Sequence, residues 1–190
     1  MINSADIHKA SILIVDDQAA NVVLLEQMLS GAGNETISST RNPREVCALH
    51  RKNRYDLILL DLQMPDMDGF QVMEDLKEIE TGSYLPVLVI TAQPDHKLRA
   101  LKAGAKDFVG KPFDFAEILI RVNNMIEIRL LHLETRKLYA RVMAEQERSG
   151  RRRFVPPTSL AHSRQGQADM AGSSPPPARP ENWDGRRAEG

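Results

Sequence analysis

The sequence lacks the features of secreted, membrane-spanning and basic nucleic-acid-binding proteins. It contains one cysteine, Cys47, among 190 residues, so no internal disulfide can form and a reducing compartment is expected. No stretch approaches the roughly 20 apolar residues that span a bilayer, and the N-terminus lacks an apolar signal segment. The formal net charge of -1 argues against a broadly basic nucleic-acid binder. These absences predict a soluble, cytoplasmic protein with no membrane contact.

The residues that are present suit one globular domain with an extension. A length of 190 residues and a hydrophobic content of 42% are typical of one ordinary domain plus additional chain. Short apolar runs that end in turn residues alternate with segments of helical spacing, and a continuous apolar run indicates a strand buried on both faces. The predicted strands are 11–15, a weak 35–38, 56–60, 86–90 and 106–109, and the predicted helices are 19–30, 42–53, one that begins at 68, 95–103 and 114–147.

The starts of three of these helices carry capping residues. Asn42, Asp68 and Asp114 each stand at the start of a predicted helix, and Asn and Asp side chains accept hydrogen bonds from the first free N–H groups. Glu45 and Glu117 lie three residues after a cap and would complete a capping box. Alternating strands and helices with short connections predict a doubly wound α/β sheet.

Composition divides the chain into four parts. We expect an N-terminal arm at 1–10, a domain at 11–127, a helical extension at 128–148 and a disordered tail at 149–190, where Pro, Gly, Ser and Arg dominate. The extension has apolar residues at three- and four-residue steps, as in a short coiled coil; these are Ile128, Leu131, Leu138 and Val142. Both a solvated helix and a dimerising or signalling helix fit this pattern.

Polar residues follow the predicted strands where each strand ends. They are Asp16, Asp17, Asp61, Thr91 and Lys111. In open α/β sheets, ligands bind at the carboxyl ends of the strands. Three carboxylates gathered there repel one another unless a cation intervenes, and carboxylates with room for water and phosphate oxygens suit Mg²⁺. With a lysine and a hydroxyl nearby, the set suits phosphoryl transfer to a carboxylate.

Four sequence segments in this order resemble a known family. The segments ILIVDDQ, LILLDLQMPDMDG, VLVITA and AGAKDFVGKPF resemble the receiver domain of two-component response regulators over about residues 10–127. The resemblance implies a flavodoxin-like (βα)5 fold with a parallel sheet of strand order 2-1-3-4-5. It also implies a cis bond between Lys111 and Pro112.

The resemblance implies roles for individual residues. Asp61 would take a phosphoryl group from a sensor histidine kinase or a phosphotransfer protein, and Lys111 would contact a phosphoryl oxygen. Thr91 and Phe108 would act as the switch pair. The Mg²⁺ ligands would be Asp16, Asp17, Asp61 and the backbone carbonyl of Gln63. Taken singly, each residue also has an ordinary interpretation, such as a helix cap, a turn acid or a core aromatic ring.

Two functions of different class follow from these features. The first is a non-enzymatic protein-interaction switch that phosphorylation controls, with a possible homodimer through the 91–127 face or the 118–147 helix. The alternative is the receiver portion of a cyclic di-GMP phosphodiesterase of the HD-GYP type, or of a cyclase regulator, whose output domain is absent or separate. No HD, GYP, GGDEF or helix-turn-helix block appears in the sequence.

Overall fold

The fold is described here from a computed structural model that describes residues 2–65, 67–80, 84–93 and 96–151. Its centre is a five-stranded sheet of β1 (Ser11–Val15), β2 (Thr36–Thr40), β3 (Leu57–Asp61), β4 (Val87–Thr91) and β5 (Asp107–Gly110). Every neighbouring pair is parallel and the order is β2-β1-β3-β4-β5. The predicted α/β architecture and strand order are confirmed. Because all strands run the same way, their carboxyl ends share one edge.

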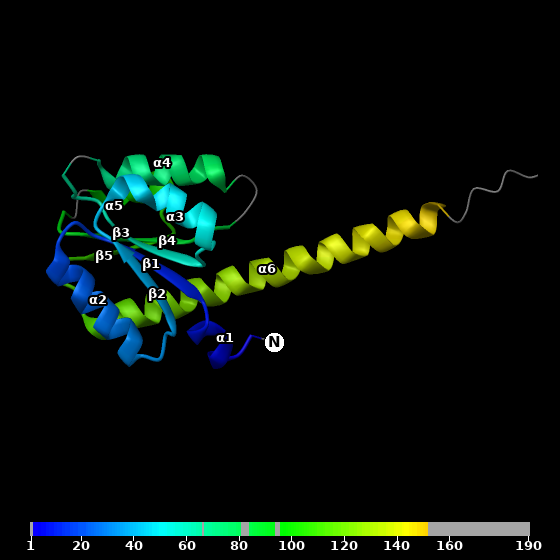
Figure 1. The fold of residues 1–190 in the computed structure, drawn as a ribbon, viewed down its shortest axis with the longest axis horizontal. Coiled ribbons are helices and arrows are strands. Elements are labelled where there is room, and N and C mark those ends of the chain that lie inside the picture. The colour runs from blue at the N-terminus through cyan, green and yellow to red at the C-terminus, as the bar shows by residue number, and fades with distance from the viewer. Residues whose placement is uncertain (1, 66, 81–83, 94–95, 152–190) are drawn as a thin grey trace, which may run out of the picture. The chain divides into compact units, whose positions relative to one another are not determined.

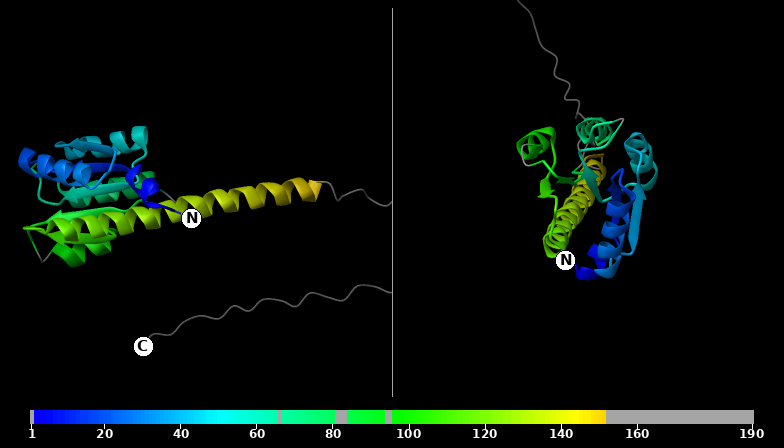
Figure 2. Two further views of the ribbon diagram at one scale, coloured as in Figure 1. Left: turned by 90° about the horizontal axis from the view of Figure 1, so that it is seen from below. Right: turned by 90° about the vertical axis from the view of Figure 1, so that its left-hand side faces the viewer.

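The helices cover both faces of this sheet (Figures 1 and 2). They are α1 (Ser4–His8), α2 (Ala19–Gly31), α3 (Val46–Asn53), α4 (Gly69–Ile79), α5 (His96–Ala103) and α6 (Phe115–Arg151), with a short 3-10 helix at Pro43–Glu45 before α3. Leu13 and Val15 of β1 face a core shared with α3, α4 and α5. Ile12 and Ile14 face a second core shared with α2 and α6. This alternation is the period of two expected of a strand buried on both faces.

The second edge strand and the N-terminal lead-in differ from expectation. The β2 strand begins at Thr36 and ends at Thr40, two residues beyond the end expected at Ser38. It is an edge strand whose first four residues are half-buried or exposed, so its sequence carries little apolar signal. The lead-in contains a helix because Asn3 and Asp6 form a capping box, a signal that the sequence displays.

The starts of the later helices agree with expectation in part. Asp68 accepts a hydrogen bond from the N–H of Phe70 at 3.0 Å and so caps α4. Asp114 accepts from the N–H of Ala116 at 2.6 Å. Glu117 was expected to complete a capping box with Asp114, but its carboxylate pairs with Arg121 at 2.7 Å. The helix expected at 42 starts as the 3-10 turn, where Asn42 accepts from the N–H of Arg44 at 3.1 Å.

The last helix runs without a break past the domain (Figure 1). Arg129 connects it to the amino end of the sheet. Its guanidinium is buried, lies 3.6 Å from the Asp56 carboxylate and donates a hydrogen bond to the carbonyl of Tyr84. Beyond that point the apolar residues of the predicted seam, among them Leu131 and Leu138, are exposed. None of the described helices is both long enough and apolar enough to cross a membrane. The expected tail lies outside the described residues from 152 onward.

Candidate acidic site at the carboxyl edge of the sheet

The residues predicted at the strand ends lie at one edge of the sheet, and hydrogen bonds link them. Asp61 ends β3 and Thr91 ends β4, while Asp16 and Lys111 directly follow β1 and β5. The N–H of Lys111 donates to the carbonyl of Thr91 at 2.8 Å. The Lys111 ammonium lies 2.6 Å from Asp61 Oδ2 and 2.9 Å from Asp16 Oδ2. One lysine therefore bridges two buried carboxylates.

Three carboxylates meet at this edge. One oxygen each from Asp16, Asp17 and Asp61 lies within 4.8 Å of the other two. Asp17 Oδ1 is buried, and no described residue makes a hydrogen bond to it. Since a buried carboxylate oxygen without a partner is costly, this oxygen calls for a ligand. A cluster of hard oxygen atoms with one of them unpaired fits a divalent cation such as Mg²⁺.

Neighbouring groups fix the orientation of the acidic side chains. Asp16 accepts from the N–H of Gln18 at 2.8 Å and from the side-chain amide of Asn21 at 3.1 Å and 2.9 Å. It does not serve as a simple helix cap, because Gln18 is the N-cap residue of α2. The N–H of Gln63 donates to Asp61 Oδ1 at 3.1 Å. These contacts hold one oxygen of Asp61 while Lys111 holds the other.

The site is short of positive charge. Burial raises the pKa of Asp61 and the nearby Asp16 charge raises it further, although the hydrogen bonds from Lys111 and Gln63 act in the opposite direction. For Lys111, burial lowers the pKa, but the hydrogen bonds and charges of Asp61 and Asp16 together outweigh burial and raise it. Lys111 therefore stays charged at neutral pH. Even so, Asp61 remains costly to ionise, and an added cation would remove that cost.

Gly69 allows α4 to pack against the end of β3. A Cβ placed there would lie 2.5 Å from the carbonyl oxygen of Asp61 and 2.9 Å from Cα of Leu62. The N–H of Gly69 also donates to the carbonyl of Leu62 at 3.2 Å. Only a residue without a side chain permits this close approach of backbone to backbone. The glycine thereby sets the path of the chain that presents Asp61.

The remaining predicted residues lie nearby with contacts of their own. Thr91 is buried and its hydroxyl oxygen accepts from the N–H of Gln93 at 3.2 Å. Phe108 is half-buried in β5, and the Lys97 ammonium lies 4.0 Å from the centre of its ring. Gln63 is exposed beside Asp61. The Lys111–Pro112 bond is cis, as the resemblance implied.

Sequence reasoning missed three contributors to the site: Gln18, Asn21 and Gly69. Asn21 lies five residues after Asp16, on the first turn of the helix that follows the strand. That spacing could have indicated the contact, because the first turn of a helix that follows a strand lies next to the carboxyl edge of the sheet. Gly69 lies at the start of α4, where the sequence predicts only the beginning of a helix, and its close approach to Asp61 depends on how α4 packs against β3.

Comparison with known proteins decides the family. The sequence model of the response regulator receiver domain matches residues 12–123. The chain belongs to the response regulator receiver family. Response regulator PleD of Caulobacter vibrioides is 37% identical over 148 residues, which cover 77% of this chain and 31% of PleD. The chemotaxis protein CheY of Thermotoga maritima is 30% identical over 114 residues, which cover 60% of this chain and 95% of CheY.

Solved receiver structures share the fold. A response regulator of Chloroflexus aurantiacus matches with a TM-score of 0.59 at 30% identity, covering 63% of this chain and 98% of that protein. The receiver domain of the sensor histidine kinase PA1611 of Pseudomonas aeruginosa matches with a TM-score of 0.58 at 27% identity, covering 63% and 98%. That structure is described with a magnesium ion coordinated in its active-site cleft.

These findings establish the general function of this chain. It contains the receiver domain of a two-component response regulator, a phosphorylation switch of the kind that histidine kinases control. Its acidic pocket is typical of the magnesium-binding site of receivers. The chain spans less than a third of the length of PleD. No comparison supports the link to an HD-GYP output, which remains a sequence-based alternative.

Proposed function

We propose that this receiver accepts a phosphoryl group on Asp61 from the phosphohistidine of a sensor kinase or phosphotransfer protein, and that the change alters its interaction surface. The observation that carries the proposal is the single ammonium of Lys111 between Asp61 and Asp16, at 2.6 Å and 2.9 Å, beside the unpaired Asp17 oxygen. Such an edge can hold a metal cation and a phosphoryl group together.

The reaction transfers a phosphoryl group from a nitrogen of the donor histidine to a carboxylate oxygen of Asp61. A carboxylate oxygen of Asp61 forms a bond to phosphorus as the phosphorus–nitrogen bond of the donor histidine breaks, and the imidazole leaves with the bonding electron pair. Asp16, Asp17 and Asp61, with the carbonyl of Gln63, would hold Mg²⁺, which supplies positive charge against the phosphoryl oxygens. Lys111, already charged, is placed to pair with another of these oxygens.

Thr91 is the residue placed to report the new charge. Its hydroxyl ends β4, the strand next to Asp61, and accepts only from the N–H of Gln93 among the described contacts. A phosphoryl oxygen offers a stronger, charged acceptor for the Thr91 O–H. Movement of Thr91 toward it would open space that the half-buried ring of Phe108 can enter. The surface over 91–127 would then have two states.

The exposed surface over α5 and α6 supplies a candidate interface for a second copy. Leu98 and Leu101 of α5 and Ile120 of α6 are large, apolar and exposed. Farther along α6, Leu131 and Leu138 of the seam are exposed as well. Exposed apolar residues at heptad spacing favour pairing of helices. We propose a homodimer through the 91–127 face or the 118–147 helix.

Phosphorylation by a small donor tests the site. The protein is incubated with phosphoramidate and Mg²⁺, and the acyl phosphate is measured by mass spectrometry and by its lability to hydroxylamine. The wild type should be labelled and the Asp61→Asn variant should not. Asp68→Asn is the matched control. This exposed acid caps α4 and makes only a long ion pair with the exposed Arg99 at 3.8 Å, and Asn caps equally well. Undiminished labelling of Asp61→Asn refutes the assignment.

Sedimentation equilibrium tests the dimer separately. The mass is measured with and without beryllofluoride and Mg²⁺, for the wild type and for a Leu131→Asp/Leu138→Asp variant. We expect a dimer that this variant abolishes, whereas Lys137→Asp, off the seam, retains it. A dimer that Leu131→Asp/Leu138→Asp leaves intact excludes the helix, and a monomer under every condition excludes both interfaces.

A further inference from the structure

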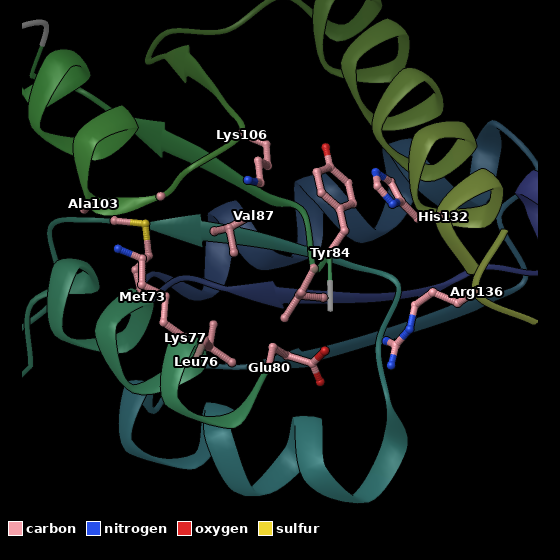
Figure 3. Close-up of a pocket in the computed structure, with 12 residues that line it drawn as sticks. Met73, Leu76, Lys77, Glu80, Tyr84, Val87, Ala103, Lys106, His132 and Arg136 are labelled. Atoms are coloured by element: carbon pink, nitrogen blue, oxygen red, sulfur yellow. The ribbon is translucent and has the colours of Figure 1, made fainter. Parts of the chain in front are cut away.

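A cavity lies at the edge of the sheet opposite the acidic site, where the strands begin (Figure 3). Its volume is about 420 Å³, within the range of small-molecule sites. Val87 is the first residue of β4 and Lys106 directly precedes β5, so both lie at the amino edge of the sheet. His132 and Arg136 of α6 close the other side. The cavity is therefore separate from the acidic site.

One wall of this cavity is apolar and another is aromatic. Met73, Leu76, Leu85 and Val87 line it and are buried. The rings of Tyr84 and His132 stack with centroids 4.6 Å apart and planes at 14°. The Lys106 ammonium lies 5.0 Å from the centre of the Tyr84 ring, and Figure 3 shows Tyr84 between Lys106 and His132. These groups can receive a flat, apolar body.

The cavity also carries unbalanced positive charge. Lys77, Lys106 and Arg136 line it, and within the described part of the chain the charged group of none of the three forms a hydrogen bond or an ion pair. Among the described lining residues the only carboxylate is that of Glu80, whose side chain is 8% exposed and is bound by His50 at 3.0 Å and Arg54 at 3.2 Å. Its charge is therefore already compensated from outside the cavity.

We propose that this cavity binds a small organic anion, with a flat apolar body on the apolar and aromatic walls and a phosphate or carboxylate among Lys77, Lys106 and Arg136. An inorganic anion alone leaves the apolar wall uncovered. A neutral ligand leaves three like charges without a partner. Arg136 can donate two parallel hydrogen bonds to such an acidic group, and the two lysines add charge.

An occupant of this cavity joins α6 to the rest of the receiver. Lys77 belongs to α4 and Lys106 to the loop before β5, whereas His132 and Arg136 belong to α6. Both α6 residues lie beyond Arg129, the last buried residue of that helix in the described chain. Binding should therefore hold a further turn of α6 against the domain, and slow amide exchange over residues 128–136 provides a readout besides affinity.

Titration with 1-naphthyl phosphate tests the proposal by calorimetry and by amide chemical shifts of the full chain. We expect saturable binding, with the largest shifts at Tyr84, His132 and Lys106. The Lys106→Gln/Arg136→Gln variant should bind at least about tenfold more weakly, because two charged contacts are lost. The control, Lys102→Gln/Lys137→Gln, removes two exposed cations outside the cavity and should bind within about twofold of wild type.

Parallel titrations identify the part of the ligand that matters. AMP, 1-naphthoate, 1-naphthol and inorganic phosphate are compared, and the acids with a ring should bind more tightly than 1-naphthol or phosphate. AMP and 1-naphthoate distinguish a nucleotide from a carboxylate source. The proposal is overturned by absence of saturable binding of 1-naphthyl phosphate. Equal affinity of the Lys106→Gln/Arg136→Gln variant, or of 1-naphthol, overturns it as well.

Discussion

The two edges of the sheet differ both in charge and in how that charge is held. At the carboxyl edge, three carboxylates lie close together, and the Lys111 ammonium bridges two of them, Asp61 at 2.6 Å and Asp16 at 2.9 Å. At the amino edge, three cations line an open cavity without ion pairs among the described residues. The charges of the carboxyl edge are thus part of the buried structure, whereas the three cations of the cavity at the amino edge lack ion-pair partners among the described residues.

This difference predicts how each edge responds to substitution. Charges that are buried and bonded to one another are costly to separate, so changes at the carboxyl edge should affect stability and function together. Exposed charges without partners contribute little to stability, so changes to the three cations of the cavity at the amino edge should affect only binding. The substitutions below test this contrast, from the largest expected effect to the smallest.

Removal of Lys111 should have the largest effect. In Lys111→Met the buried carboxylates of Asp16 and Asp61 lose their common partner, and without metal the protein should lose about 3 kcal/mol of unfolding free energy. Added Mg²⁺ should restore part of the loss. Urea unfolding measures both, with Lys106→Met from the amino edge as the control, expected within about 0.5 kcal/mol of wild type. Equal losses in the two variants would remove the contrast.

Addition of a methyl group at Gly69 should come next. Because its Cβ would lie 2.5 Å from the carbonyl oxygen of Asp61, Gly69→Ala must displace the end of β3, at a cost of about 2 kcal/mol. Labelling by phosphoramidate should slow as well. In Gly31→Ala the added Cβ meets nothing within 4 Å, so that control should be neutral or slightly stabilising in thermal unfolding. A neutral Gly69→Ala would show that the strand end adapts freely.

The site at the carboxyl edge could be predicted from the sequence for a structural reason. Each of Asp16, Asp61, Thr91 and Lys111 ends or directly follows an apolar strand, so finding the strands also located the site. The strand order follows from the family resemblance. The contacts of Asn21 and Gly69 depend on how helices pack against the strand ends, and the periodicity of the sequence does not predict this packing.

The amino edge could not be found in this way. Its lining residues come from α4, the start of β4, the loop before β5 and the middle of α6, and no motif links them along the chain. Arg129 could not be predicted as a contact residue either. Its sequence context indicates a surface charge in a polar helix, but in the structure it pairs with Asp56 at the amino end of the sheet. The expected end of edge strand β2 falls two residues short of the observed end, because few of its residues are buried.

Arg129 tests whether the effect of a substitution depends on the edge of the sheet or on the burial of the charge, because it lies at the amino edge and is nevertheless buried and paired. Arg129→Met should cost about 1.5 kcal/mol, since Asp56 and the carbonyl of Tyr84 each lose a partner. Thermal unfolding and amide exchange over 124–136 measure the effect. Arg141→Met, an exposed arginine of the same helix, should change neither. No effect of Arg129→Met would show that α6 docks through its apolar face alone.

Neutralising Asp61 should have the smallest effect, and the opposite sign. Because burial raises the pKa of this carboxyl, its ionised form opposes folding at neutral pH, and metal-free Asp61→Asn should be more stable by about 1 kcal/mol. As pH falls through the raised pKa toward the unfolded value near 3.9, wild-type Asp61 takes up a proton and the difference should shrink. Urea unfolding from pH 7 to pH 4 measures it, and a destabilised Asp61→Asn at pH 7 contradicts the sign.

Binding of beryllofluoride tests the central claim, that the carboxyl edge gathers a metal ion and a phosphoryl group at Asp61. Fluorine NMR of the protein with beryllium and fluoride should show a bound signal for the wild type only when Mg²⁺ is present, and none for Asp61→Asn. A bound signal without Mg²⁺, or one that Asp61→Asn retains, would contradict the account.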